Sequence, residues 1–139
     1  MADGRVTTAA GELQAILFAL LGVVNRDTGN VSLTEIFSGL QTAGFPFSPQ
    51  FFVLMKFKNP KSESFETHLQ IDDPNGTVIW SPPDSTLNIR LDPPTFAMLT
   101  FVQATFKAPG PYTLRASIDG VEVASEEFTV LEVKTAVAK

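Results

Sequence analysis

The chain has 139 residues, of which 44% are hydrophobic and 18% charged, enough for one globular domain with a single core. It contains no cysteine and one histidine, His68, which excludes disulfide scaffolds, thiol catalysis and the common zinc and serine-hydrolase sites. Its net charge of -5 disfavours nucleic acids and anionic membranes. We therefore expect a protein that is not an enzyme, with no metal, no cofactor and no nucleic-acid partner.

The two ends of the chain show no sustained periodicity. We predict tails over residues 1–11 and 134–139, around one domain over residues 12–133. The apolar segment 13–24 is too short to cross about 30 Å of hydrocarbon as a helix, and it lacks the features of an export signal. We expect a cytoplasmic protein with no membrane partner. The segment itself is predicted as a strand, with a buried helix as the alternative.

Alternation of apolar and polar residues with period two recurs along the rest of the chain and indicates β-strands. In residues 30–40 a helical turn capped by Ser32 is an alternative. Residues 95–107 are apolar on both parities, which is typical of a central strand. A bulge or break is expected near Ser125, where the apolar parity changes. The eight or nine predicted strands cover about 13–24, 30–40, 50–58, 64–72, 76–81, 86–92, 95–107, 111–119 and 121–133.

Turn-forming residues fall between these segments at short intervals. Asp119-Gly120 is typical of a two-residue hairpin turn, and the pair Pro93-Pro94 interrupts strand pairing. Many short strands with inward apolar rows must cover those rows with a second layer. The predicted fold class is all-β: an antiparallel two-sheet β-sandwich, immunoglobulin-like or C2-like, with a closed barrel as the alternative.

The order of the turn motifs is itself distinctive. An apolar strand leads into Val24-Asn25-Arg26-Asp27-Thr28-Gly29-Asn30-Val31-Ser32-Leu33, followed by Phe45-Pro46, Asp73-Pro74-Asn75-Gly76, Pro109-Gly110-Pro111-Tyr112 and Asp119-Gly120. On these motifs, residues 13–133 resemble an uncharacterised bacterial single-domain β-sandwich family, a domain of unknown function. The resemblance implies a cytoplasmic bacterial source, no established ligand and no catalytic residues.

Several large apolar residues lie on strand faces that alternation assigns to solvent. Either the apolar segment 13–24 covers them, or they form an interface for a protein partner or a second copy. We predict the function of a non-enzymatic protein-interaction or structural module, with a homo-oligomer as one form of it. The candidate interface residues are Phe45, Phe47, Phe52, Leu54, Leu99 and Phe101.

The alternative function is a module that binds carbohydrate or calcium. Trp80 would stack on a sugar ring, and Asp27, Asp73 and Asp119 would supply loop carboxylates. Turn chemistry alone accounts for the three aspartates, because short carboxylates bond nearby backbone N–H groups. His68 is expected on a polar strand face, solvated or paired with a neighbour.

Overall fold

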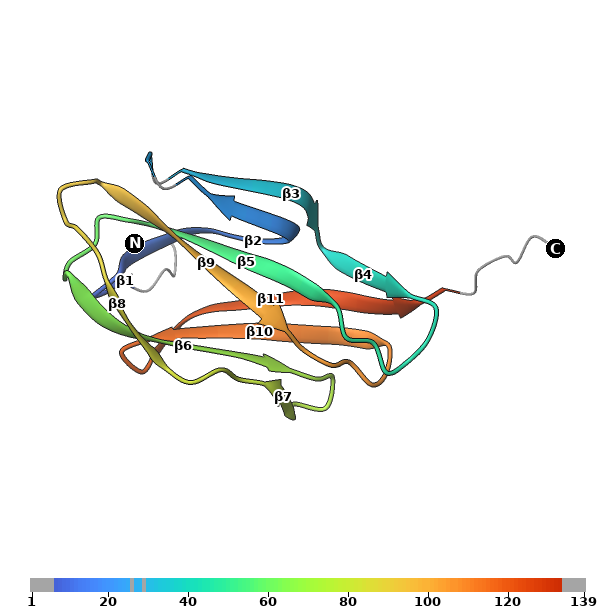
Figure 1. Cartoon of the computed structure of the whole chain (residues 1–139). Coiled ribbons are helices and arrows are strands. Elements are labelled where there is room, and N and C mark those ends of the chain that lie inside the picture. Colours follow the sequence, from blue (N-terminus) through green and yellow to red (C-terminus); the bar gives the residue numbers. More distant parts are fainter. Residues whose placement is uncertain (1–6, 26, 29, 134–139) are drawn as a thin grey trace.

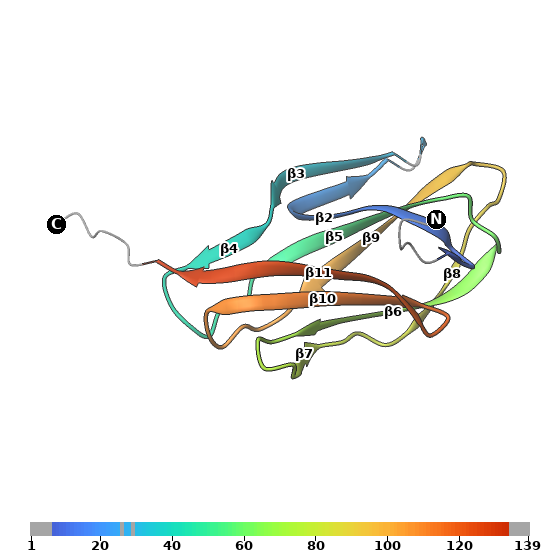
Figure 2. The ribbon, with the colours of Figure 1, turned by 180° about the vertical axis from the view of Figure 1, so that it is seen from behind.

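The structure is a computed structural model that describes residues 7–25, 27–28 and 30–133. Over these residues it contains eleven strands. None of the residues described forms a helix suited to crossing a membrane. The strands form two sheets packed face to face (Figures 1 and 2), which confirms the predicted all-β sandwich.

The first sheet has the order β1-β2-β5-β9, with β3 also paired to β2, and the second has the order β4-β11-β10-β6-β7, with β8 paired to β6. All pairs are antiparallel except β4 with β11, which run parallel. In the first sheet the bounds are β1 Thr7–Thr8, β2 Gly11–Val24, β3 Val31–Phe37, β5 Gln50–Lys58 and β9 Thr95–Gln103. In the second they are β4 Gly39–Thr42, β6 Ser64–Asp72, β7 Val78–Trp80, β8 Ser85–Asn88, β10 Gly110–Ile118 and β11 Val121–Glu132.

The clearest alternation gave the most accurate predictions. Strands β5 and β6 have the predicted bounds, and β10 begins and ends one residue earlier than expected. On β5 every second side chain is fully buried, because that face packs against the second sheet. The predicted bulge also occurs, since Ala116 pairs with Ala124 while Ser117 pairs with Glu122 and leaves Val123 as the extra residue.

The prediction of one strand over residues 30–40 was wrong. The chain forms β3 in the first sheet, passes through Ser38, and forms β4 in the second sheet. The helical alternatives for residues 13–24 and 30–40 were wrong as well, because both segments are strands. A change of sheet between two short strands leaves the alternation continuous, so periodicity cannot detect it.

Three later strands are shorter than predicted, and the first of them, β7, covers only Val78–Trp80 of the predicted 76–81. Strand β8 ends at Asn88 and not at 92 as predicted, and Leu91 is 41% exposed beside the ion pair of Arg90 with Asp92. Strand β9 ends at Gln103 and lies at the edge of its sheet, so the prediction of a central strand was also wrong. Beyond it, Phe106 pairs with Phe47 in an isolated bridge.

Part of the predicted N-terminal tail is built into the first sheet. Thr7 and Thr8 pair with the start of β2, and Ala10 is fully buried. The carbonyl oxygen of Ala9 accepts hydrogen bonds from two backbone N–H groups of the β5–β6 connection. The predicted tail at 134–139, and residues 1–6 of the other one, lie outside the described residues.

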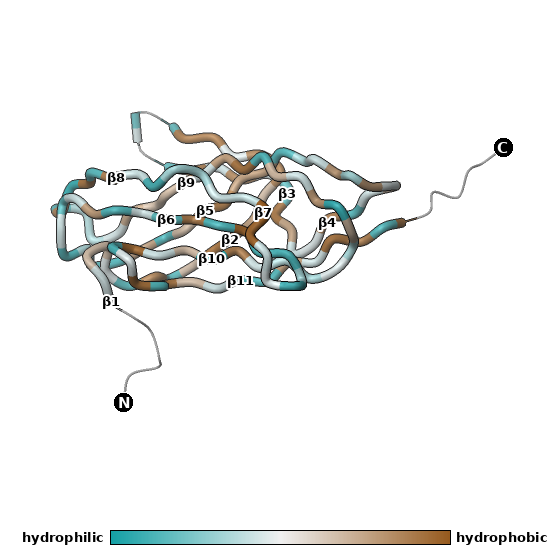
Figure 3. The backbone as a smooth tube through the Cα atoms, turned by 90° about the horizontal axis from the view of Figure 1, so that it is seen from below, coloured by the Kyte–Doolittle hydropathy of each residue, from teal (hydrophilic) through white to brown (hydrophobic). Residues whose placement is uncertain are grey.

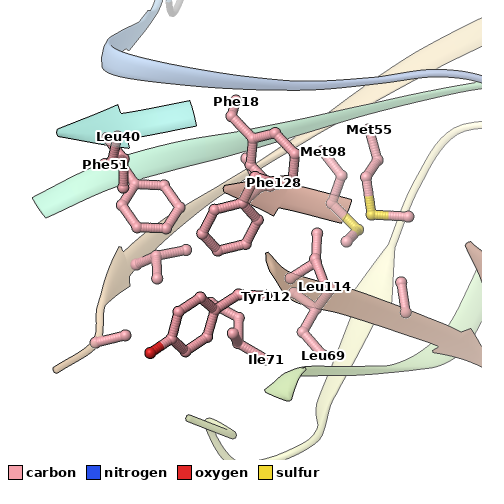
Figure 4. Packing of buried hydrophobic residues seen from close by; sticks show 14 of the residues in the cluster. Phe18, Leu40, Phe51, Met55, Leu69, Ile71, Met98, Tyr112, Leu114 and Phe128 are labelled. Carbon is pink, nitrogen blue, oxygen red and sulfur yellow. The ribbon is translucent and has the colours of Figure 1, made fainter. Parts of the chain in front are cut away.

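Aromatic rings from both sheets meet at the centre of the sandwich (Figure 4). The Phe128 ring of β11 lies 5.0 Å from that of Phe18 and 6.0 Å from that of Phe51, both in the first sheet. It also lies 5.9 Å from the Phe106 ring and 6.2 Å from the Tyr112 ring. Offset and edge-to-face contacts of this kind add to the stabilisation that burial of the rings provides. Phe128 therefore joins the two sheets.

Candidate interaction surface

The second half of β2 leaves its sheet. Residue pairing between β2 and β5 ends at Ala19 with Phe52, and the rest of β2 pairs with β3 alone. The next residue of β2, Leu20, and the facing residue of β3, Glu35, are not paired, although the pairs on either side of them are formed. Glu35 has a φ of 58°. A left-handed residue in one strand of a hairpin bends that strand. Leu20–Val24 and Val31–Ile36, here called the folded-back hairpin, accordingly lie as an extra layer over the first sheet (Figure 1).

Gly22 rests directly on the outer face of the first sheet. A Cβ atom added to it would lie 3.1 Å from both terminal methyl carbons of Leu99 and 3.3 Å from Cγ of Phe52. These two side chains come from β9 and β5, so the hairpin crosses both strands. Only glycine, which has no side chain, lets the backbone of the hairpin lie this close to Leu99 and Phe52 without displacing them. Gly22 thus sets how closely the hairpin covers the sheet.

The opposite face of the hairpin is apolar and open. Because side chains alternate along a strand, the neighbours of Gly22 point away from the sheet. Leu21 is 51% exposed and Val23 56% exposed, opposite Thr34 and Ser32 of β3. The chain is coloured as hydrophobic along this part of β2 in Figure 3. With Leu20, Val24 and Ile36, the hairpin carries five of the eleven large apolar residues that are exposed in the described part of the chain.

The six residues predicted as an interface do not share one exposed surface. Phe52, Leu54 and Leu99 are half-buried on the outer face of the first sheet, and Gly22 covers part of that face. The fourth, Phe101, is 47% exposed, with its ring 5.1 Å from that of Phe52. The loop residues Phe45 and Phe47 are half-buried and pack against the core.

The outward hairpin face was therefore missed by the sequence analysis. Its signal was present, since residues 15–24 lack the polar positions that a half-buried strand shows. That segment was considered as a cover for other apolar residues, and the structure places it there. Periodicity does not reveal the bend at Leu20, which exposes the outward face of the folded-back hairpin to solvent.

A chain of polar side chains crosses the outer face of the second sheet. The buried carboxylate of Asp72 accepts a 2.8 Å hydrogen bond from Nε of Arg115, whose Nη1 donates to Glu122 at 3.1 Å. These bonds, the one to Asp72 first, raise the pKa of Arg115. Asp72 also accepts a 2.8 Å bond from the side-chain amide of Gln70.

His68 continues this chain. Its Nε2 lies 2.9 Å from Oε1 of Gln70 and its Nδ1 lies 2.7 Å from Oδ1 of Asp84. These hydrogen bonds, the one to Gln70 first, raise the pKa of His68 above its ordinary 6.5. Both ring nitrogens have partners, as expected for a paired histidine on a polar strand face. The arrangement holds β6 to its neighbours and leaves no ring nitrogen free for proton transfer.

The residues of the alternative function are not brought together. Oδ1 of Asp73 accepts from the N–H groups of Asn75 and Thr77, and Oδ1 of Asp119 accepts from that of Glu66. These two turns lie at opposite ends of β6, about 20 Å apart at the rise of a strand. Asp27 lies in the turn between β2 and β3, on the other sheet. No three metal-ligating side chains cluster within the residues described.

Trp80 is also separate from a hollow on the second sheet. Trp80 is half-buried at the end of β7 and packs against the core. The hollow, of about 560 Å³, lies between the turn after β6 and residues 105–109. The polar groups in its lining include the Asp73 carboxylate and the Tyr112 hydroxyl, which already bond the local backbone. Trp80 does not line this hollow, so the predicted stacking residue and the hollow do not form one site.

Comparison with solved structures finds proteins of distant similarity. The soluble domain of PmoD from Methylocystis sp. ATCC 49242 is 14% identical over 86% of this chain and 90% of that one, with a TM-score of 0.42. An immunoglobulin-like protein from Pseudomonas aeruginosa is 14% identical over 88% and 99%, with a TM-score of 0.38. The Pseudomonas fluorescens DNA glycosylase AlkC is 12% identical over 69% and 28%, with a TM-score of 0.43.

Comparison with curated proteins finds no match. A family profile, in contrast, covers most of the chain. Residues 18–131 match a family described as a family of unknown function, DUF6941. This stretch contains the folded-back hairpin, every strand from β3 to β10, and β11 as far as Leu131, while β1 and the start of β2 precede it. It confirms the resemblance drawn from the turn motifs. The chain belongs to the DUF6941 family.

Proposed function

We propose that this domain is a non-enzymatic interaction module that binds another protein through the outward face of the folded-back hairpin. The observation that carries the proposal is the exposure of Leu21 and Val23, which are 51% and 56% accessible on adjacent positions of that face. Contiguous exposed apolar residues of this kind mark protein-binding surfaces.

The composition of the hairpin fits a protein partner. The core of a protein interface is depleted in charged residues and has a polar rim. Glu35 is the one charged residue in the folded-back hairpin as defined, and it lies at the bend. Ser32 and Thr34 flank the apolar pair and can hydrogen-bond to a partner. The turn at the tip adds Asp27, an exposed charge suited to a rim.

The non-enzymatic part of the proposal rests on the polar chain of the second sheet. His68 is bonded through both ring nitrogens, and Asp72 is bonded by Arg115 and Gln70. Side chains that satisfy one another across an open strand face act as structural links. A catalytic base needs one nitrogen or oxygen free to reach a substrate.

A photo-crosslinking experiment tests the proposal. A benzophenone amino acid replaces Val23 in one form of the full chain and Thr86 in a control, since Thr86 is exposed on β8 of the other sheet. We expect a specific protein adduct from cells for the Val23 form alone. The adduct's purified protein should bind the wild-type chain and bind Leu21→Ser/Val23→Ser at least about tenfold more weakly, a loss that corresponds to about 1.4 kcal/mol.

The double variant also provides a control for folding. Both substituted side chains are more than half exposed, so the melting temperature should change little. Adducts of equal yield at Val23 and Thr86, or unchanged partner binding by the folded double variant, would contradict the proposal.

A further inference from the structure

Strand β9 is an unusually apolar edge strand. Its nine residues, Thr95–Gln103, contain no charged side chain, and within the described residues its backbone ladder is formed with β5 alone. Natural edge strands are commonly short, charged, interrupted by proline or covered, because an open edge binds other strands. The sequence of β9 is instead that of a strand in the middle of a sheet.

The neighbouring segment does not close this edge. Pro82 and Pro83 face β9 across a hollow of about 320 Å³ that is lined on the β9 side by Met98, Leu99, Thr100 and Phe101. Proline has no N–H group, so these two residues cannot donate to the carbonyl groups of β9. Because side chains of both faces of β9 line the hollow, it runs beside the strand edge itself.

We propose that β9 pairs antiparallel with β9 of a second copy of this chain, with Leu99 opposite Leu99. The two first sheets then form one continuous sheet across a twofold axis, and β9 becomes a central strand. This register is the one that pairs all nine residues, from Thr95 opposite Gln103 through the centre. A shift of the centre by one residue to Met98 or Thr100 leaves two residues at the end of each strand unpaired.

Side-chain size and charge favour a second copy as the occupant. On the outer face, Ala97 would lie opposite Phe101 of the other copy, so a small residue accommodates the exposed ring. On the inner face, Met98 would lie opposite Thr100. No like charges meet along the strand, even though each copy carries a net charge of -5. A self-complementary strand of this kind gives the isologous contact of a twofold dimer.

This inference uses a surface separate from the outward hairpin face. Leu21 and Val23 point away from the first sheet, whereas the β9 edge lies in the plane of that sheet. The two proposals can therefore fail independently. The variant Leu21→Ser/Val23→Ser should keep the dimer, while loss of the dimer in this variant alone would assign self-association to the hairpin.

The first test is the mass of the full chain by light scattering at several concentrations. We expect twice the 15.1 kDa of one copy, decreasing toward 15.1 kDa on dilution. Ala97→Glu should give a monomer at every concentration, since the carboxylate would face Phe101 of the other copy. Within one copy the new carboxylate lies beside Lys56, so the fold of each copy should be retained. The matched control Asn88→Glu adds the same charge on β8 and should remain a dimer.

Cysteine cross-linking tests the register. The chain has no cysteine, and directly opposite residues of antiparallel strands have Cα atoms about 4.5 to 5.5 Å apart, which a disulfide can span. Leu99→Cys should therefore oxidise to a covalent dimer. Ala97→Cys alone and Phe101→Cys alone should not, because like positions lie about 14 Å apart along the strands. The double variant Ala97→Cys/Phe101→Cys should cross-link.

Each outcome bears on the proposal. A chain that stays monomeric at all concentrations overturns it, and so does a dimer that Ala97→Glu leaves intact. Equal cross-linking of all single-cysteine variants, or failure of Leu99→Cys in a chain that is dimeric by mass, overturns the register. Dimerisation lost in Ala97→Glu, retained in Asn88→Glu and trapped by Leu99→Cys supports it.

Discussion

The hydroxyl of Tyr112 donates a 2.6 Å hydrogen bond to the backbone carbonyl of Ala108, four residues earlier in the chain. Tyr112 lies near the start of β10 and is almost fully buried, with its ring edge-on to that of Phe106 at 4.8 Å. The same hydrogen bond, called a tyrosine corner, occurs where immunoglobulin-like sandwiches cross from one sheet to the other. Here it fixes the crossing from β9 to β10.

Tyr112→Phe should lower the free energy of unfolding by about 1 to 2 kcal/mol, because it removes this hydrogen bond and leaves the ring in place. Urea unfolding followed by Trp80 fluorescence measures the change. Ring packing with Phe106 and Phe128 is retained, so the transition should stay cooperative. A stability equal to that of the wild type would mean that solvent replaces the Tyr112 hydroxyl at no cost.

Phe128→Ala should lower the free energy of unfolding by about 3 to 5 kcal/mol, since it leaves a cavity among rings of both sheets. The control Leu131→Ala lies three residues later on the same strand, at a side chain that is 48% exposed. It should change the stability by less than about 1 kcal/mol. Similar effects of both variants in calorimetry would contradict the placement of Phe128.

Gly22→Val should destabilise the domain by about 1 to 3 kcal/mol, because the new side chain overlaps Leu99. Leu99→Ala in the same chain should recover part of the loss by making room, so the two changes should be less than additive in a double-mutant cycle. Gly44→Val is the matched control, since nothing lies within 4 Å of a Cβ added there. Strict additivity would show that the hairpin does not rest on Leu99.

Stability should depend on pH through His68. The pKa of His68 in the folded state is raised above 6.5, so folding favours the protonated form of the ring. The resulting gain in folding stability is complete below pH 6.5 and is lost as the pH rises through the folded pKa. Its size is modest, since the side chain is 36% exposed and solvent screens the pair. NMR titration of the single histidine should give a lower pKa in Asp84→Asn. An unchanged titration in that variant would remove Asp84 as a cause.

The sequence predicted those parts of the fold in which local pattern and tertiary environment agree. Strand β5 alternates between buried and less buried residues along its whole length, so its bounds could be located from the sequence alone. The turn at Asp119-Gly120 was also recognisable from local sequence, because Asp-Gly is typical of a hairpin turn in which both residues adopt positive φ angles, as they do here.

The features that define the site depend on contacts between distant residues. The bend at Leu20 occurs in residues 15–24 of β2, which are uniformly apolar, so no change of period marks it. The pairing of Asp72 with Arg115 requires the β6–β10 register, and 43 residues separate the two side chains. Neither relationship can be derived from one sequence without knowing which strands are neighbours.

The parallel pairing of β4 with β11 has a consequence for how the domain forms. Leu40 pairs with Val130, far later in the chain, so within the described residues β4 has no strand partner until β11 has been synthesised. The same last strand supplies Phe128, on which the rings of both sheets converge. Non-local pairings of this kind form slowly, because a long loop must close first. A nascent chain that still lacks β11 therefore keeps these aromatic residues uncovered, and synthesis of β11 allows the sandwich to form.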